Sequence, residues 1–244
     1  MKKILSYILT PIFYIAFGLV LVFFHPLQWI AVKLNMMKLH TKIVNFLNFS
    51  IIRTLGLLGT TIKFEQPVKL PKDRPIIFVS NHQSMYDIPP LIWFLRKHQP
   101  KFVSKMSLGK GIPSISINLR EGGSVLIDRA KPTEAVEKLK NFGKYIEKNL
   151  KSAVIFPEGT RSKNGEMKPF KEKGLKTLLD FAPNALVVPV TINNTYKLTG
   201  DSNFPLGVFS RISLYVHQPV DRTSGISDMI QQIETAIKSK LIFS

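Results

Sequence analysis

The stretch that decides the fold is Pro75-Ile76-Ile77-Phe78-Val79-Ser80-Asn81-His82-Gln83-Ser84-Met85-Tyr86-Asp87. Its first half, residues 76–79, is an uninterrupted apolar run with a proline before it and polar residues after it, which predicts a buried strand. Its second half turns polar at once and places His82 five residues before Asp87. In an open α/β sheet, ligands bind at the carboxyl ends of the strands, so we expect both side chains at a binding site.

His82 and Asp87 are the residue types of a general base and the carboxylate that orients it. Histidine accepts a proton near neutral pH, and a carboxylate within reach holds its tautomer and stabilises the imidazolium that forms. The chain has no cysteine and no Gly-x-Ser-x-Gly elbow to supply a nucleophile. We therefore predict that the attacking hydroxyl belongs to the substrate and that His82 is its base. The structural alternative is that Ser80, Asn81 and Asp87 are loop and helix-capping residues.

A second polar string, Phe156-Pro157-Glu158-Gly159-Thr160-Arg161-Ser162, follows a predicted strand at 153–156. Gly159 lets the backbone approach a ligand closely, and the guanidinium of Arg161 offers a planar fork for phosphate. Glu158 is placed to orient that arginine or to bond a substrate hydroxyl. The alternative interpretation is an ordinary Pro-Glu-Gly turn with a surface arginine.

Two further cations follow the ends of predicted strands. Lys105 comes after a strand at 101–104, and Arg129 comes after one at 124–127. Taken singly, each is a solvated surface charge. Strand ends of this kind line one edge of a sheet. We therefore expect the polar groups to lie together there, with the base His82 facing an anion site formed by the cations.

The composition indicates anionic partners. The net charge is +18, and residues 96–176 hold 19 Lys and Arg against 8 Asp and Glu, a net of +11. Such an excess fits nucleic acid, an anionic membrane or a phosphorylated substrate, with a generally basic surface as the alternative. No nucleic-acid-binding motif accompanies it, so we expect no nucleic-acid partner. The chain lacks cysteine and its five histidines are scattered, so we expect no protein-ligated metal.

The N-terminal residues 4–24 run for 21 positions without a charge, which is long enough to span a bilayer. Residues 1–3 resemble the start of a signal peptide. However, the apolar run is longer than a signal peptide's and no cleavage site follows, so we expect it to be retained. Lysines flank the run on both sides, and the positive-inside rule then places both flanks on the cytoplasmic side.

A second segment, residues 43–58, carries an apolar stripe at helical spacing. We expect the two helices, hinged through His25-Pro26 and the stretch around Trp29, to lie in one leaflet as a hairpin anchor. A single transmembrane span is the alternative. In either case we expect residues 1–59 to be a membrane anchor and residues 60–244 to be an α/β domain that stays folded without it.

From residue 60 the pattern alternates between strands and helices, as in an α/β domain with a mostly parallel or mixed sheet flanked by helices. Amphipathic helices are predicted around 135–150 and 226–241. In Val187-Val188-Pro189-Val190 the proline lacks one ladder hydrogen bond, which predicts an edge strand or a bulge. The strands are predicted near 62–65, 76–80, 101–104, 124–127, 153–156, 186–191 and 211–217.

These strings resemble those of the 1-acyl-sn-glycerol-3-phosphate acyltransferase (lysophosphatidic acid acyltransferase) family of the glycerolipid acyltransferases. Residues 81–87 match the family's first block, Asn-His-x-Ser-x-x-Asp, which contains the His-x4-Asp motif, and residues 156–162 match its third block in full. Residues 187–190 look like the fourth block, and residues 126–129, with Lys105 upstream, are similar to the second. The hydrophobic N-terminus is also similar to that of bacterial members.

The resemblance implies a reaction. His82, oriented by Asp87, would take the proton from the sn-2 hydroxyl of lysophosphatidic acid, and that oxygen would attack the thioester of acyl-coenzyme A or acyl carrier protein to give phosphatidic acid. No metal, other cofactor or covalent acyl-enzyme would take part. The residues implied to bind glycerol phosphate are Glu158, Gly159, Thr160, Arg161, Arg129 and Lys105.

The resemblance also implies a place in the cell, the cytoplasmic face of a membrane and more narrowly the inner membrane of a bacterium. The alternative functions are acylation of another lyso-lipid and non-catalytic binding of anionic lipid. One stretch departs from the family. After Pro113 the family often has aromatic residues and a glycine, where this chain has Ser114-Ile115-Ser116-Ile117. The role of residues 105–120 and the acyl-chain preference therefore stay open.

Overall fold

One sheet runs through the middle of the molecule. In the computed structural model, which describes residues 1–200, 202–222 and 225–242, seven strands follow the order β1-β7-β6-β2-β5-β3-β4. Neighbouring strands are parallel except for β6 and β7. This confirms the predicted mixed, mostly parallel sheet. The strands are β1 (Thr61–Glu65), β2 (Ile76–Ser80), β3 (Pro100–Lys105), β4 (Val125–Ile127), β5 (Ser152–Ile155), β6 (Leu186–Asn193) and β7 (Arg211–Val216).

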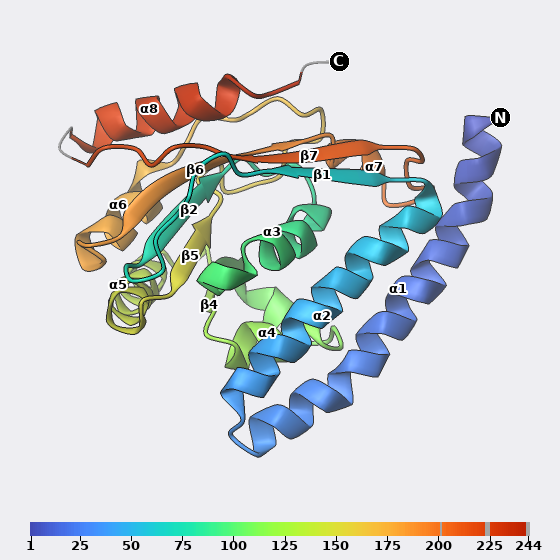
Figure 1. The fold of residues 1–244 in the computed structure, drawn as a ribbon, viewed down its shortest axis with the longest axis horizontal. Coiled ribbons are helices and arrows are strands. Elements are labelled where there is room, and N and C mark those ends of the chain that lie inside the picture. Colours follow the sequence, from blue (N-terminus) through green and yellow to red (C-terminus); the bar gives the residue numbers. More distant parts are fainter. Residues whose placement is uncertain (201, 223–224, 243–244) are drawn as a thin grey trace.

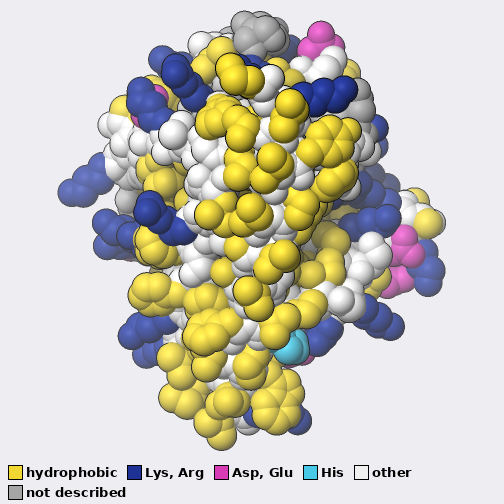
Figure 2. All heavy atoms as spheres, turned by 90° about the vertical axis from the view of Figure 1, so that its right-hand side faces the viewer, with side chains coloured by type: hydrophobic (Ala, Val, Ile, Leu, Met, Phe, Trp, Pro, Cys, Tyr) yellow, Lys and Arg dark blue, Asp and Glu magenta, His cyan; other side chains and the backbone are white. Residues whose placement is uncertain are grey.

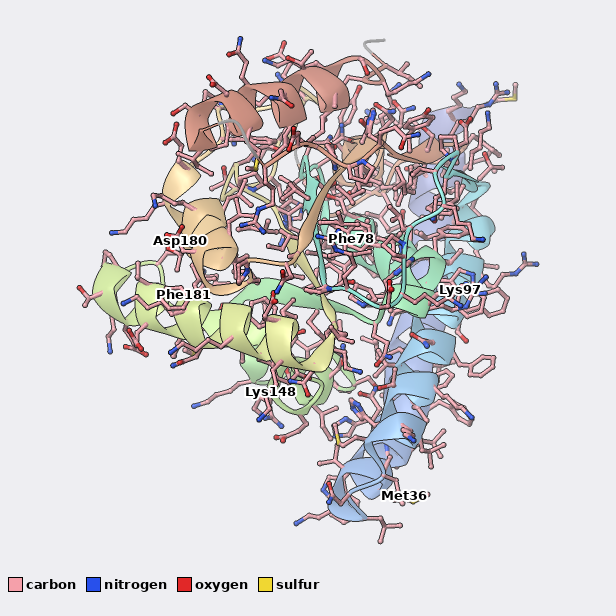
Figure 3. The ribbon with its side chains drawn as sticks, turned by 60° about the vertical axis from the view of Figure 1, so that its left-hand side comes forward. Met36, Phe78, Lys97, Lys148, Asp180 and Phe181 are labelled. Carbon is pink, nitrogen blue, oxygen red and sulfur yellow. The ribbon has the colours of Figure 1, made fainter. Side chains whose placement is uncertain are left out.

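Helices cover both faces of the sheet. Along β2, Ile76 and Phe78 point to one face and Ile77 and Val79 to the other, and all four are fully buried. The first face packs against α1, α2 and α3, and the second against α5, α6 and α8 (Figures 1 and 3). The helices are α1 (Lys2–Lys33), α2 (Met37–Leu55), α3 (Ile88–Phe94), α4 (Ile115–Glu121), α5 (Pro132–Asn149), α6 (Glu172–Phe181), α7 (Tyr196–Thr199) and α8 (Ile226–Lys238).

Helices α1 and α2 lie side by side as an antiparallel hairpin along one side of the molecule (Figure 1), with Met36 at its tip (Figure 3). Among the described residues, α1 is the helix that is long and apolar enough to cross a membrane, and an 18-residue stretch of it has a mean hydropathy of 2.3. Figure 2 shows that hydrophobic side chains cover the outer face of the hairpin, with Lys and Arg along its sides. Exposed apolar side chains on α1 include Ile4, Ile8, Ile15, Leu19, Val22 and Phe23.

The turn between the two helices lies later than predicted. Helix α1 continues through Pro26 to Lys33, so the predicted hinge at His25-Pro26 is wrong. Tertiary contacts hold the helix here: Ser114 donates its N–H to Nδ1 of His25 over 3.0 Å and its hydroxyl to the carbonyl of Leu21 over 2.6 Å. These bonds help to offset the helical hydrogen bond that proline removes. The stretch that departs from the family pattern, 114–117, thus begins with the residue that binds α1.

The hairpin and the α/β part share one hydrophobic core. Phe13 of α1 and both Val44 and Leu55 of α2 belong to the same buried cluster as Phe78 of β2. Removing residues 1–58 would uncover that face of the sheet, so we now expect residues 60–244 alone to unfold or aggregate, contrary to the prediction from the sequence. The division at residue 60 remains a proposal about membrane binding.

The proline-containing strand lies inside the sheet. β6 is flanked by β7 and β2, so the edge alternative is wrong and the bulge alternative applies. Between the pairs Val190–Val216 and Val187–Val220, β6 has two residues, 188 and 189, and the opposite chain has three, 217–219. Pro189 therefore lies where the ladder is irregular, and no regular bond is lost at its nitrogen.

Candidate active site

His82 and Asp87 lie together just past the carboxyl end of β2, as predicted. Nδ1 of His82 is 2.7 Å from Oδ2 of Asp87. The side chain of Asp87 is fully buried, whereas 15% of the His82 side chain is exposed. Because an ionised carboxylate only accepts hydrogen bonds, Nδ1 carries the proton and Nε2 presents its lone pair. Within the described residues Nε2 has no hydrogen-bond partner, so it is available to a substrate hydroxyl.

The loop after β2 is built around the Asp87 carboxylate. Its Oδ2 atom also accepts the backbone N–H groups of Gln83 over 2.8 Å and Ser84 over 3.0 Å. The side chain of Ser84 accepts the N–H of Tyr86 and caps the short 3-10 helix Met85–Asp87. Asp87 is therefore both the capping residue of the structural alternative and the carboxylate of the catalytic interpretation. The cap holds Asp87 in place, and Asp87 holds His82.

Phe156 holds the plane of the His82 ring. The two rings stack with their centroids 4.1 Å apart and their planes 18° from parallel. Phe156 directly follows β5, which pairs with β2 up to Val79 and Ile155, so the residues after both strands meet. The stack fixes the face of the imidazole and leaves its Nε2 edge open.

Glu158 is a buried bridge. Its Oε1 accepts the N–H of His82 over 2.7 Å, and its Oε2 accepts the N–H of Lys168 over 2.8 Å. Burial raises the pKa of this carboxyl, and the two backbone N–H groups oppose that shift. Both oxygens are bonded to the protein, which favours a role in positioning the His82 loop over a bond to a substrate hydroxyl or to Arg161.

The rest of the second polar string forms a turn at the same edge of the sheet. Gly159 has a φ of 72°, a backbone conformation that favours glycine. The ammonium of Lys168 donates to the hydroxyl of Thr160 over 3.0 Å and to the carbonyl of Arg161 over 2.9 Å. The side chain of Arg161 is exposed, so its guanidinium is accessible to an anion from solvent.

The two further cations differ in their contacts. Arg129 joins the turn, because its guanidinium donates to the carbonyl of Gly159. Lys105 ends β3, is exposed, and forms no hydrogen bond or ion pair within the described part of the chain. β5 separates β3 from β2. The structure thus brings Arg129 to the second polar string and leaves Lys105 on the same edge without a contact to the histidine.

Thr195 is a site residue that the motifs did not reveal. It follows β6, is fully buried, and donates its hydroxyl to Oδ1 of Asp87. The side chain of Asn81 ties the loop after β2 to the end of β6, since it donates to the carbonyl of Ile192 and accepts its N–H, both over 2.8 Å. Polar residues directly after a buried strand marked the other site residues, and the same rule applied to 193–195 would have selected Thr195.

The fold and the site define an α/β protein with a histidine–aspartate pair at the carboxyl edge of its sheet. The chain belongs to the Acyltransferase family, whose model matches residues 61–193. The solved structure of the 1-acyl-sn-glycerophosphate (LPA) acyltransferase of Thermotoga maritima superposes with a TM-score of 0.80 and 27% identity, covering 98% of this chain and 95% of that one.

Curated relatives carry the same activity in their names. The chloroplastic 1-acyl-sn-glycerol-3-phosphate acyltransferase BAT2 of Brassica napus is 34% identical over 148 residues, which is 61% of this chain and 41% of that protein. The 1-acyl-sn-glycerol-3-phosphate acyltransferase of Saccharomyces cerevisiae is 30% identical over 193 residues, 76% of this chain and 60% of that protein. The match thus spans roughly half the length of these relatives.

Proposed function

We propose that the protein transfers a fatty acyl chain from an acyl thioester to the sn-2 hydroxyl of lysophosphatidic acid and so produces phosphatidic acid. The observation that carries this proposal is the His82 imidazole, held by Asp87 at Nδ1 and open at Nε2 within the described residues. Such a group is suited to take a proton from an alcohol. The acceptor is supported by the full-length similarity to the acyltransferase of Thermotoga maritima.

The reaction needs no nucleophile from the protein. Nε2 of His82 takes the proton of the sn-2 hydroxyl while that oxygen attacks the thioester carbonyl. The tetrahedral intermediate then collapses, the C–S bond breaks, and the leaving sulfur receives the proton from the imidazolium. Asp87 stabilises the imidazolium and Phe156 keeps its plane fixed. General-base assistance contributes about 10²- to 10⁴-fold in rate, so positioning of both substrates supplies much of the rest.

Cations beside the base are assigned to the acceptor phosphate. Arg161 has an exposed guanidinium, and Arg129 is bonded to the same turn at Gly159. A planar guanidinium can bind two phosphate oxygens at once. Thr160 and Gly159 would shape this turn, with Glu158 anchoring it to the loop of His82. Lys105 is assigned to longer-range attraction of the anionic substrates. The carrier of the acyl donor, either coenzyme A or acyl carrier protein, is one of these anions.

We infer that the α1–α2 hairpin lies in one membrane leaflet on the cytoplasmic face. Contacts at both halves of α1 support this position: Ser6 bonds the carbonyl of Leu206, and His25 accepts the N–H of Ser114. A helix that crosses a hydrocarbon core of about 30 Å cannot keep both halves against a water-facing domain. The apolar outer face would enter the lipid, as in other interfacial helices (Figure 2).

Membrane binding can be tested on that face. Leu19 and Phe23 are each 65% exposed on α1. Changing both to Gln should reduce flotation of the protein with anionic vesicles while its thermal unfolding stays the same. Leu150→Gln, directly after the distant helix α5, is the matched control, because Leu150 is also exposed, at 51%, and should leave flotation unchanged. Equal flotation of all three proteins would show that the basic surface alone binds the membrane.

The acyl transfer is tested with purified full-length protein in mixed micelles. Lysophosphatidic acid is offered in parallel with lysophosphatidylcholine, lysophosphatidylethanolamine and a phosphate-free lyso-aminolipid, each with acyl-coenzyme A and with acyl carrier protein. We expect turnover with lysophosphatidic acid and formation of phosphatidic acid. Preference for a phosphate-free acceptor would reassign the substrate. Lipid binding without any turnover would leave the non-catalytic alternative.

A further inference from the structure

We propose that Thr195 is a positioning residue for the His82–Asp87 pair, and that delivering it is the function of the proline-containing strand β6. This inference rests on the proposed function for its kinetic consequences but not for its structural ones. Thr195 lies two residues past the range that the family model matches, 61–193. It is fully buried beside a fully buried carboxylate.

The two oxygens of Asp87 have different partners. Oδ2 accepts from Nδ1 of His82 and from the N–H groups of Gln83 and Ser84. Oδ1 accepts the hydroxyl of Thr195. Rotation of the carboxylate about its bond to Cβ moves both oxygens, so the donors at Oδ2 and the hydroxyl at Oδ1 resist it together. Thr195 supplies the restraint at Oδ1 and so helps to keep Oδ2 facing the imidazole.

The single proton of the Thr195 hydroxyl is committed to Asp87. Oε1 of Gln83 lies 3.3 Å from the same hydroxyl, but it also accepts the backbone N–H of Thr195 over 3.2 Å. A threonine hydroxyl has one proton to donate, and the charged carboxylate is the stronger acceptor. The amide of Gln83 thus anchors the backbone of Thr195 while its hydroxyl serves Asp87.

The position of Thr195 depends on β6. Pairing between β2 and β6 runs in register up to Ser80 and Val190, and the side chain of Asn81 continues it by bonding both backbone groups of Ile192. The chain then turns at Asn194, which has a φ of 67°, and brings Thr195 over Asp87. The fourth sequence string, which carries no chemistry of its own, therefore acts by placing this hydroxyl.

Kinetics separate positioning from simple packing. We expect Thr195→Val, which removes the hydroxyl and keeps the shape, to lower kcat on the order of 10- to 100-fold with little change in KM for lysophosphatidic acid. Thr195→Ser keeps the hydroxyl and should retain most of the kcat. If the valine variant fails to fold, Thr195→Ala is compared with Thr195→Ser instead. Both lack the methyl group of threonine, and only the serine keeps the hydroxyl.

Thr191 offers a matched control on the same strand. It is also fully buried, and its hydroxyl contacts Nε2 of His217 over 2.8 Å and the carbonyl of Ile237 over 2.9 Å. Thr191→Val should therefore cost stability and leave kcat unchanged. Equal loss of kcat in Thr191→Val and Thr195→Val, full kcat in Thr195→Val, or no rescue by Thr195→Ser would each overturn the proposal.

A second measurement does not depend on turnover. The proton on Nδ1 of His82 gives a downfield NMR resonance, identified by its loss in His82→Gln. We expect Thr195→Val to shift this resonance and Thr191→Val to leave it in place. If the wild-type protein fails to acylate lysophosphatidic acid but the shift is seen, the proposed function is wrong and the positioning role stands. An unshifted resonance rejects the positioning role whatever the activity.

Discussion

Two histidines that each follow a strand of the sheet have opposite surroundings. His82, after β2, donates from Nδ1 to a carboxylate, and 15% of its side chain is exposed. His217, after β7, is 8% exposed and contacts the hydroxyl of Thr191 through Nε2. Thr191 donates its one proton to the carbonyl of Ile237, so Nε2 of His217 must be the donor in this contact. The two imidazoles therefore hold opposite tautomers.

The difference shows which surroundings suit a histidine to act as a base in this fold. Burial and the nearby charge of Lys240 lower the pKa of His217 to about 4, so this ring stays neutral and structural. His82 has instead a buried carboxylate as its partner at Nδ1, and within the described residues its second nitrogen has no partner. The type of residue is the same, and the charge of the partner and the access to solvent decide the role.

The largest expected effect is the difference in acyl-transfer rate between variants of the two histidines. His82→Ala should lower acyl transfer on the order of 10²- to 10⁴-fold, because the base is lost. His217→Gln should keep the rate within a few-fold of wild type, because a neutral amide can also donate to Thr191. Initial rates with lysophosphatidic acid check both variants, and thermal unfolding checks that both are folded. A fully active His82→Ala protein would reject the base assignment.

A smaller effect is expected when the charged partner of His82 is replaced by a neutral one. His217 already has a neutral partner, the hydroxyl of Thr191. Asp87→Asn keeps the imidazole but replaces the carboxylate that orients it, so we expect a loss of about 10²-fold in kcat. The variant should also be less stable by about 1–3 kcal/mol, because a buried acceptor of several N–H groups is changed. Rates and denaturant unfolding measure the two losses, and an unchanged kcat would contradict the comparison.

The smallest expected effect is on stability against pH. Between pH 6.5 and about 4, His217 binds a proton in the unfolded chain but not in the folded protein, so folding stability falls as the pH is lowered through this range. We expect this group to account for at most about 3 kcal/mol across this range. The free energy of unfolding of wild type minus that of His217→Gln, measured across these pH values, isolates it. A difference that does not change with pH would show that His217 is not buried in the neutral form.

Much of the site could be predicted because it depends on local sequence. A buried apolar run followed at once by polar residues marks a strand and its carboxyl end, and this rule located His82, Asp87, Glu158 and Arg161. The rule does not say which polar groups contact each other. Glu158 was expected near substrate or Arg161, but both its oxygens hold backbone N–H groups.

The N-terminal hairpin shows the same limit. Its apolar length and its helical stripe were evident from residues 4–24 and 43–58. The position of its turn was not, because Pro26 is a local signal for a break that contacts from Ser114, 88 positions further along, override. For the same reason the sequence did not reveal that Phe13 enters the core of the α/β part.

By itself the sequence determined the alternating strands and helices, the pairing of His82 with Asp87, and the apolar N-terminus, because each depends on residue type and short-range spacing. Only the tertiary structure decided the interior place of β6, the meeting of Thr195 with Asp87, and the union of hairpin and sheet in one core. These depend on contacts between residues as much as 200 positions apart, and such contacts are set by packing rather than by any local pattern.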